Sequence, residues 1–79
     1  MILNVRYFGM IAETVKSENE KIALENSVSV ATFRTELIKK YPALKNANYQ
    51  IAVDQELVGD EFKIESDCEI ALLPPFAGG

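Results

Sequence analysis

Apolar and polar residues alternate along five short stretches of the chain, as they do in half-buried β-strands. In the first stretch Leu3, Val5 and Tyr7 share one face, and in the last stretch Ile70 and Leu72 do so. We expect these faces to point into a hydrophobic core. The predicted strands cover residues 2–8, 20–25, 49–54, 57–58 and 68–73.

Apolar residues recur at spacings of three and four between Ser29 and Pro42, which predicts one substantial helix. Ser29 is the expected N-cap, Lys39 and Lys40 suit the negative end of the helix dipole, and Pro42 ends the helix. The apolar positions of this helix are Val30, Phe33, Leu37, Ile38 and Tyr41.

A shorter helix is expected at residues 10–16, after Gly9 breaks the first strand. The residues whose spacing suits this helix are Met10, Ala12, Glu13 and Val15. Residues 43–48 are predicted to form a polar connection. With one main helix among several strands, the order predicts an α+β roll in which a mixed sheet packs on one main helix.

The chain of 79 residues has room for one domain, and its 48% hydrophobic content favours a packed core. Twelve acidic residues outnumber eight basic ones, which argues against nucleic acid or an anionic membrane as a partner. We find neither an apolar run long enough to span a membrane nor a signal-peptide pattern at the N-terminus, so we expect a cytoplasmic protein.

The chain has one cysteine, Cys68, and no histidine. This composition excludes a disulfide framework, a zinc site of Cys and His ligands, and catalysis by a Ser-His-Asp or Cys-His arrangement. We expect no bound metal and no bound cofactor, and a binding or carrier module is favoured over an enzyme. Cys68 is expected to be an ordinary thiol, because the sequence places no His or second Cys to lower its pKa.

The last six residues, Pro74, Pro75, Phe76, Ala77, Gly78 and Gly79, contain two of the three prolines and two of the four glycines. The prolines should hold the chain extended after the last strand, and the glycines let a backbone pass where side chains would clash. Six extended residues reach roughly 20 Å. We therefore expect a domain at 1–73 and a tail at 74–79 that enters another protein, although a frayed terminus is the simpler alternative.

Several segments resemble one known family: Val5-Arg6-Tyr7-Phe8 with Glu13, Ser27-Val28-Ser29-Val30, Ile51-Ala52-Val53, and the ending Ile70–Gly79. The chain resembles the sulfur-carrying small subunits of molybdopterin synthase, the MoaD-like branch of the ubiquitin-like sulfur carriers. The resemblance implies a β-grasp fold. Gly-Gly is shared with ubiquitin and the thiamin carriers, whereas Pro-Pro after an apolar strand is more specific, and Phe76 replaces a smaller aliphatic residue often found in the family.

The resemblance also implies a mechanism. An E1-like adenylyltransferase would use ATP to activate the carboxylate of Gly79, and sulfur transfer would leave a thiocarboxylate there. The tail, with Gly78 and Gly79 at its end, would then enter the large subunit of molybdopterin synthase. There it would give sulfur to precursor Z, the cyclic pyranopterin monophosphate, within a heterotetramer. The chain would have no turnover on its own.

Phe8, Leu57 and Leu73 are apolar residues on the expected outward face of the sheet, beside the tail. We interpret them as a docking patch, which the resembled family uses for its partners. Residues 54–69 hold seven acidic residues and one basic residue. We interpret this segment as either a solvated loop or a region that steers a basic partner toward the chain.

Three other functions remain open from the sequence. One is a sulfur carrier for thiamin or another sulfur-containing metabolite, since the acceptor is chosen by the partner. It also fits a ubiquitin-like modifier that forms an isopeptide bond through Gly79. The last alternative is a plain interaction module with a disordered tail.

Overall fold

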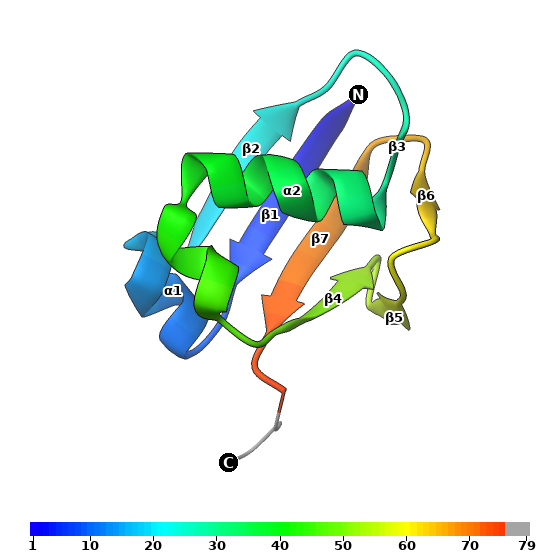
Figure 1. Cartoon of the computed structure of the whole chain (residues 1–79). Helices are drawn as coiled ribbons and strands as arrows, with labels where there is room; N and C mark the ends of the chain where they lie inside the picture. The colour runs from blue at the N-terminus through cyan, green and yellow to red at the C-terminus, as the bar shows by residue number, and fades with distance from the viewer. Residues whose placement is uncertain (76–79) are drawn as a thin grey trace.

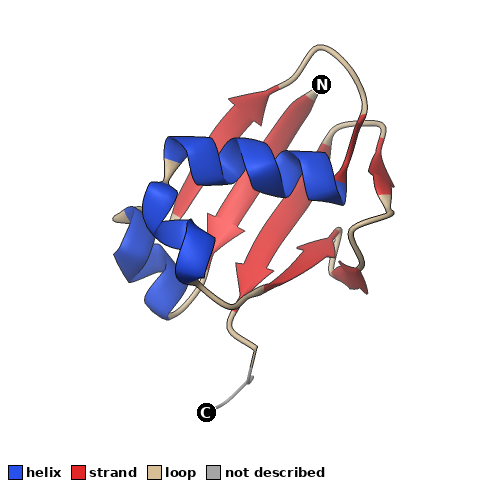
Figure 2. Cartoon of the chain, viewed as in Figure 1, coloured by secondary structure: helices blue, strands red, loops and turns tan. Residues whose placement is uncertain are grey.

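The computed structural model describes residues 1–75 and has a five-stranded mixed sheet with its main helix on one face (Figures 1 and 2). The strand order in this sheet is β2-β1-β7-β4-β5. The strands are β1 (Ile2–Tyr7), β2 (Asn19–Ala23), β4 (Gln50–Val53), β5 (Glu56–Val58) and β7 (Cys68–Leu73). The main helix is α2 (Val30–Lys40). The predicted α+β roll is confirmed.

Strands β1 and β7, from the two ends of the chain, lie side by side at the centre of the sheet and run parallel (Figure 1). The other neighbouring strands in the sheet are antiparallel. The register pairs Val5 with Ile70 and Tyr7 with Leu72. Both pairs belong to the core, so one face of the two central strands is apolar throughout.

The core lies between the sheet and α2, and the expected strand parity is confirmed. Leu3, Val5, Ile70 and Leu72 are each 0% exposed. From the helix, Val30, Phe33 and Leu37 pack against them and are buried. Ile38 and Tyr41 are only partly buried at the edge of this core.

Helix α2 begins and ends as the sequence predicts. The Ser29 side chain caps it by accepting a hydrogen bond from the N–H of Thr32 at 3.1 Å. At the other end, the N–H of Tyr41 donates to the carbonyl oxygen of Leu37 at 2.8 Å, and Pro42 follows.

Three expectations were wrong or incomplete, each because tertiary packing was not visible in the local pattern. Helix α1 (Met10–Val15) forms, but it buries Ile11 and Val15 and leaves Met10 76% exposed. The connection at 43–48 is not wholly polar, because a 3₁₀ helix, η1 (Pro42–Asn46), buries Leu44 at 1% exposure. A small second sheet pairs β3 (Val28–Ser29) with β6 (Lys63–Ile64). Neither of its strands was predicted.

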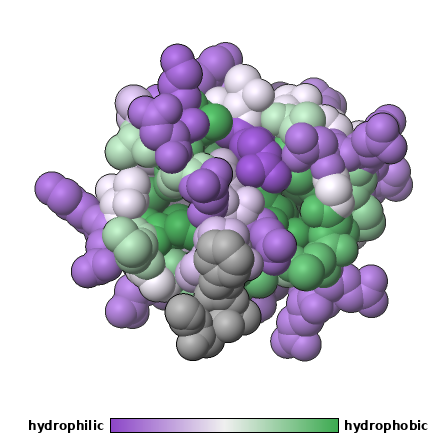
Figure 3. Space-filling view, turned by 60° about the horizontal axis from the view of Figure 1, so that its bottom comes forward, coloured by the Kyte–Doolittle hydropathy of each residue, from purple (hydrophilic) through white to green (hydrophobic). Residues whose placement is uncertain are grey.

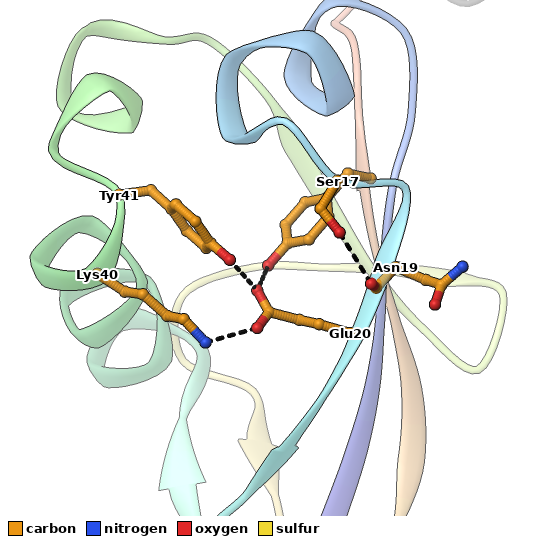
Figure 4. A network of polar contacts seen from close by, with 6 residues as sticks. Ser17, Asn19, Glu20, Lys40 and Tyr41 are labelled. Carbon is orange, nitrogen blue, oxygen red and sulfur yellow. Dashed lines mark hydrogen bonds and ion pairs between the residues drawn. The ribbon is translucent and has the colours of Figure 1, made fainter.

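A carboxylate on β2 joins three elements of the fold (Figure 4). The hydroxyls of Tyr7 and Tyr41 donate to Glu20 Oε1 at 2.5 and 2.6 Å, and Lys40 Nζ donates to Oε2 at 2.5 Å. The Glu20 side chain is 17% exposed. It therefore ties the first strand, the edge strand and the end of α2 together in a poorly hydrated place, which strengthens each contact.

This network shifts the pKa values of its members. Burial by itself would raise the pKa of Glu20, but the hydrogen bonds from Lys40, Tyr41 and Tyr7 outweigh it and hold that pKa below its ordinary value. Burial and the neighbouring carboxylate of Glu20 both raise the pKa of Tyr7. The hydrogen bond to Glu20 raises the pKa of Lys40 and that of Tyr41.

We predict that Glu20→Gln lowers the free energy of unfolding by about 2 kcal/mol at neutral pH, since hydrogen bonds to a charged group are lost. A carboxyl whose pKa is lowered by folding stabilises the fold above its unfolded pKa, about 4.3, and loses this contribution as the pH falls through the folded pKa. Urea unfolding across a pH series should therefore show a weaker loss of stability in acid for the variant. The control is Glu25→Gln in the exposed turn, which should follow the wild type throughout.

Candidate functional site

The tail leaves the domain from the end of the central strand β7. Pro74 follows Leu73 and lies against Gly9, the residue that follows β1 and Phe8. Gly9 has φ of 57°, and an added Cβ would lie 3.0 Å from Cγ of Pro74. The N–H of Phe8 also donates to the carbonyl oxygen of Leu72 at 3.2 Å. The base of the tail is thus packed on the end of the first strand.

The sequence analysis missed this role of Gly9. The available signal was its position directly after a strand, where a residue with positive φ is often glycine. Its closeness to Pro74 follows only from the parallel pairing of β1 with β7, which local patterns do not reveal.

Two of the six tail residues lie within the described part of the chain. Pro74 is half-buried and Pro75 is exposed. Phe76, Ala77, Gly78 and Gly79 lie outside the described residues, so the extended tail and its reactive terminus stay predictions.

The three residues of the predicted docking patch do lie on the outward face of the sheet. Phe8 and Leu73 follow the paired residues Tyr7 and Leu72, so they lie at the same end of neighbouring strands, and both are half-buried. Leu57 on β5 is 62% exposed.

Leu57 stands at one end of a row across the sheet that contains two alanines and reaches Arg6 on β1. It lies opposite Ala52, which in turn lies opposite Ala71 on β7. Ala52 is only 4% exposed, and Leu73 lies two residues beyond Ala71 on the same face of β7. At the rim, the Arg6 guanidinium lies 5.2 Å from the centre of the Phe8 ring.

Four of the seven acids between residues 54 and 69 make side-chain contacts with other parts of the fold, and one of them is Glu69, whose Oε1 lies 3.9 Å from Arg6 Nη1. Asp54 Oδ1 accepts from the N–H of Glu69 at 3.0 Å, and Asp67 Oδ1 accepts from the N–H of Ile2 at 2.7 Å. Asp60 pairs with Arg34 at 3.2 Å. Part of the negative charge of this segment therefore serves the fold.

Cys68 begins β7 and is partly buried. Burial raises the pKa of its thiol, and the nearby carboxylates of Asp54 and Asp67 add to the effect. The thiol is therefore a weak nucleophile at neutral pH, as expected.

Over residues 1–75 the structure shows no cluster of three or more His, Cys, Asp or Glu side chains arranged to hold a metal ion. None of the helices in that part of the chain is both long and apolar enough to cross a membrane.

The sequence model of the ThiS family matches residues 5–79. The chain belongs to the ThiS family. A curated relative, the molybdopterin synthase sulfur carrier subunit of Caenorhabditis briggsae, is 33% identical over 81 residues, covering 98% of this chain and 96% of the relative. This match confirms the resemblance noted from the sequence.

Two solved structures show that this member of the ThiS family has the ubiquitin-like β-grasp fold. The putative molybdopterin converting factor subunit 1 of Pyrococcus furiosus superposes with a TM-score of 0.88 at 19% identity, over 96% of this chain and 99% of that one. A chain from the complex of subunits 1 and 2 of the molybdopterin-converting factor of Helicobacter pylori has a TM-score of 0.69 at 27% identity, with both chains covered completely.

The opposite faces of Leu72 and Leu73 give a test of the register of β7 in this ThiS-family chain. Leu72→Ala should cost about 2–5 kcal/mol of unfolding free energy, because it leaves a cavity in the core. Leu73→Ala should cost clearly less, since its side chain is half-buried on the other face. Equal losses in chemical unfolding would mean that the strand is shifted by one residue.

Proposed function

We propose that this ThiS-family chain is the sulfur carrier subunit of a molybdopterin synthase in molybdenum cofactor biosynthesis. The observation that carries the proposal is the 33% identity to a curated sulfur carrier subunit over nearly the full length of both chains. The structure supports it by placing the base of the tail at the end of the central strand, beside a partly exposed apolar face.

The proposed chemistry takes place at the carboxylate of Gly79. A carboxylate oxygen attacks the α-phosphorus of ATP on an E1-like adenylyltransferase, and pyrophosphate leaves. A sulfide-equivalent nucleophile then attacks the acyl carbon, AMP leaves, and a thiocarboxylate remains. In the synthase this sulfur passes to precursor Z. Adenylation is needed because a carboxylate has no good leaving group.

The chain's own contribution is delivery rather than catalysis. It has no histidine, and its cysteine has a raised pKa, so general acid–base and thiolate chemistry fall to the partners. Pro74 and Pro75 restrict the backbone at the base of the tail, and Gly78 and Gly79 lack side chains that would obstruct a narrow channel.

The proposed partners are the E1-like enzyme and the large subunit of the synthase. The Helicobacter pylori structure contains subunits 1 and 2 of the molybdopterin-converting factor together. We assign the corresponding docking surface of this chain to Phe8, Leu57 and Leu73, which border the tail on the outward face of the sheet.

We predict that incubation with the activating enzyme, ATP and a sulfur source increases the mass of the chain by one oxygen-to-sulfur exchange. Fragmentation should place the exchange at Gly79, and a chain that lacks Gly79 should fold normally and give no productive exchange. An unchanged mass with an active enzyme would refute the carrier function.

The acceptor can be tested with the loaded carrier. Sulfur should appear in the pterin when the large subunit and precursor Z are supplied. Transfer only to a thiazole-forming enzyme would indicate thiamin synthesis instead, and conjugates of higher mass linked through lysine would indicate a protein modifier.

The docking surface makes a separate prediction. Leu73→Asp should weaken binding to the large subunit by about 2 kcal/mol, because a charge replaces an apolar contact in a desolvated interface. Ala23→Asp adds the same charge to the exposed edge strand β2, opposite Ile2 at the far end of β1, and should bind as the wild type does. Titration calorimetry measures both, and equal affinities for the two variants would exclude Leu73 from the interface.

A further inference from the structure

A groove of about 380 Å³ lies beside the base of the tail, on the side formed by α1 and by the chain after η1. Its walls come from three separate segments of the chain. The residues that line it are Gly9, Met10, Ile11, Thr14, Ala47, Asn48, Pro74 and Pro75.

Met10 is the most exposed large hydrophobic residue in the described part of the chain, at 76%. The next residue, Ile11, is only 4% exposed and forms part of the groove where it meets the core. Met10 therefore contributes little to the core, and leaving so much of a flexible apolar side chain in water has no structural benefit. Methionine at such a position is typical of surfaces that adapt to a partner's side chain.

The groove and the docking patch lie on different sides of the point where the tail leaves. Phe8 and Leu73 belong to the outward face of the sheet, whereas Met10 and Ala47 belong to the segments on the helical side. Figure 3, in which this end of the molecule is turned toward the viewer, shows hydrophobic side chains in two separate areas of the surface that faces the viewer. Pro74 lines the groove and directly follows Leu73 of the patch.

The length of the tail limits where a partner can lie. Four residues follow Pro75, and fully extended they reach at most about 14 Å. A protein whose active site holds the Gly79 carboxylate must therefore come within that distance of Pro75. Because Pro74 and Pro75 form one wall of the groove, the groove lies where such a protein approaches.

We propose that the large subunit of the synthase, when it takes up the tail, inserts an apolar side chain into this groove against Met10, so that the base of the tail is held from both sides. The proposal rests on the proposed function and adds a second contact surface to it. The partner group is an aliphatic or aromatic side chain, since the exposed rim is Met10 and the floor includes Ile11 and Pro74.

The test compares two variants of similar size at the rim. Met10→Gln keeps the length of the side chain but makes it polar, and it should weaken the complex with the synthase large subunit about tenfold. Met10→Leu should restore most of the affinity. Ile2→Gln, a matched change at a partly exposed residue at the other end of β1, should bind like the wild type. All three should keep the unfolding midpoint of the wild type.

Two results would overturn the proposal. If Met10→Gln binds the large subunit as tightly as the wild type does, the groove lies outside the interface while the proposed function stands. If the wild-type chain does not bind the large subunit at all, the proposed function and the groove contact both fail.

A fluorescence measurement distinguishes the partner from the chain's own tail as the occupant. The chain has no tryptophan, so Phe76→Trp introduces a single probe. Without a partner, we expect the tryptophan emission of the Phe76→Trp chain to be the same with and without the Met10→Gln substitution. A red shift on that substitution would place the tail's own aromatic residue in the groove and would overturn the assignment to a partner.

Discussion

The parallel pairing of β1 with β7 is the contact on which the rest of the molecule depends. It joins the first and last strands at the centre of the sheet and sets Tyr7 opposite Leu72. That register determines which leucine of the last strand enters the core and which lies on the outward face of the sheet. It also brings Gly9 to Pro74, so the direction in which the tail leaves is fixed by the same hydrogen-bonded ladder that closes the fold.

A tail anchored in this way depends on complete folding of the domain. The pairing of β1 with β7 joins residues that are more than sixty positions apart in the sequence, and such contacts form only after a long loop has been closed. The surfaces on either side of the tail are assembled by the same step, because each includes residues at or just after the ends of the two strands: Phe8 and Leu73 in the patch, Gly9 and Pro74 in the groove. A partner that binds these surfaces therefore takes up the tail only when the domain is folded.

The alternation of apolar and polar residues was enough to predict the main strands, and apolar residues spaced three and four apart were enough to predict helix α2. The Ser29 cap followed from the residue type at the start of that helix. Each of these is a local property of the sequence. The alternation also placed Phe8, Leu57 and Leu73 on the outward face. Tertiary contacts decided the rest. Ile11 and Leu44 lie in segments of six and five residues, where the neighbouring elements decide which side chain is buried. The network around Glu20 needs side chains from three elements that are distant in the sequence.

If the chain works as proposed, it meets two enzymes in turn with a single tail, so the two compete and the first complex must dissociate before the second forms. Slow dissociation from either enzyme would limit the cycle, and affinity differences among related complexes lie mostly in that rate. Patches of partly exposed residues beside the tail, rather than a large obligate interface, suit such exchange. These patches are identical in the loaded and unloaded carrier, which differ by one atom at Gly79. Docking therefore does not distinguish the loaded from the unloaded carrier. Only the partner's active site can distinguish sulfur from oxygen at Gly79.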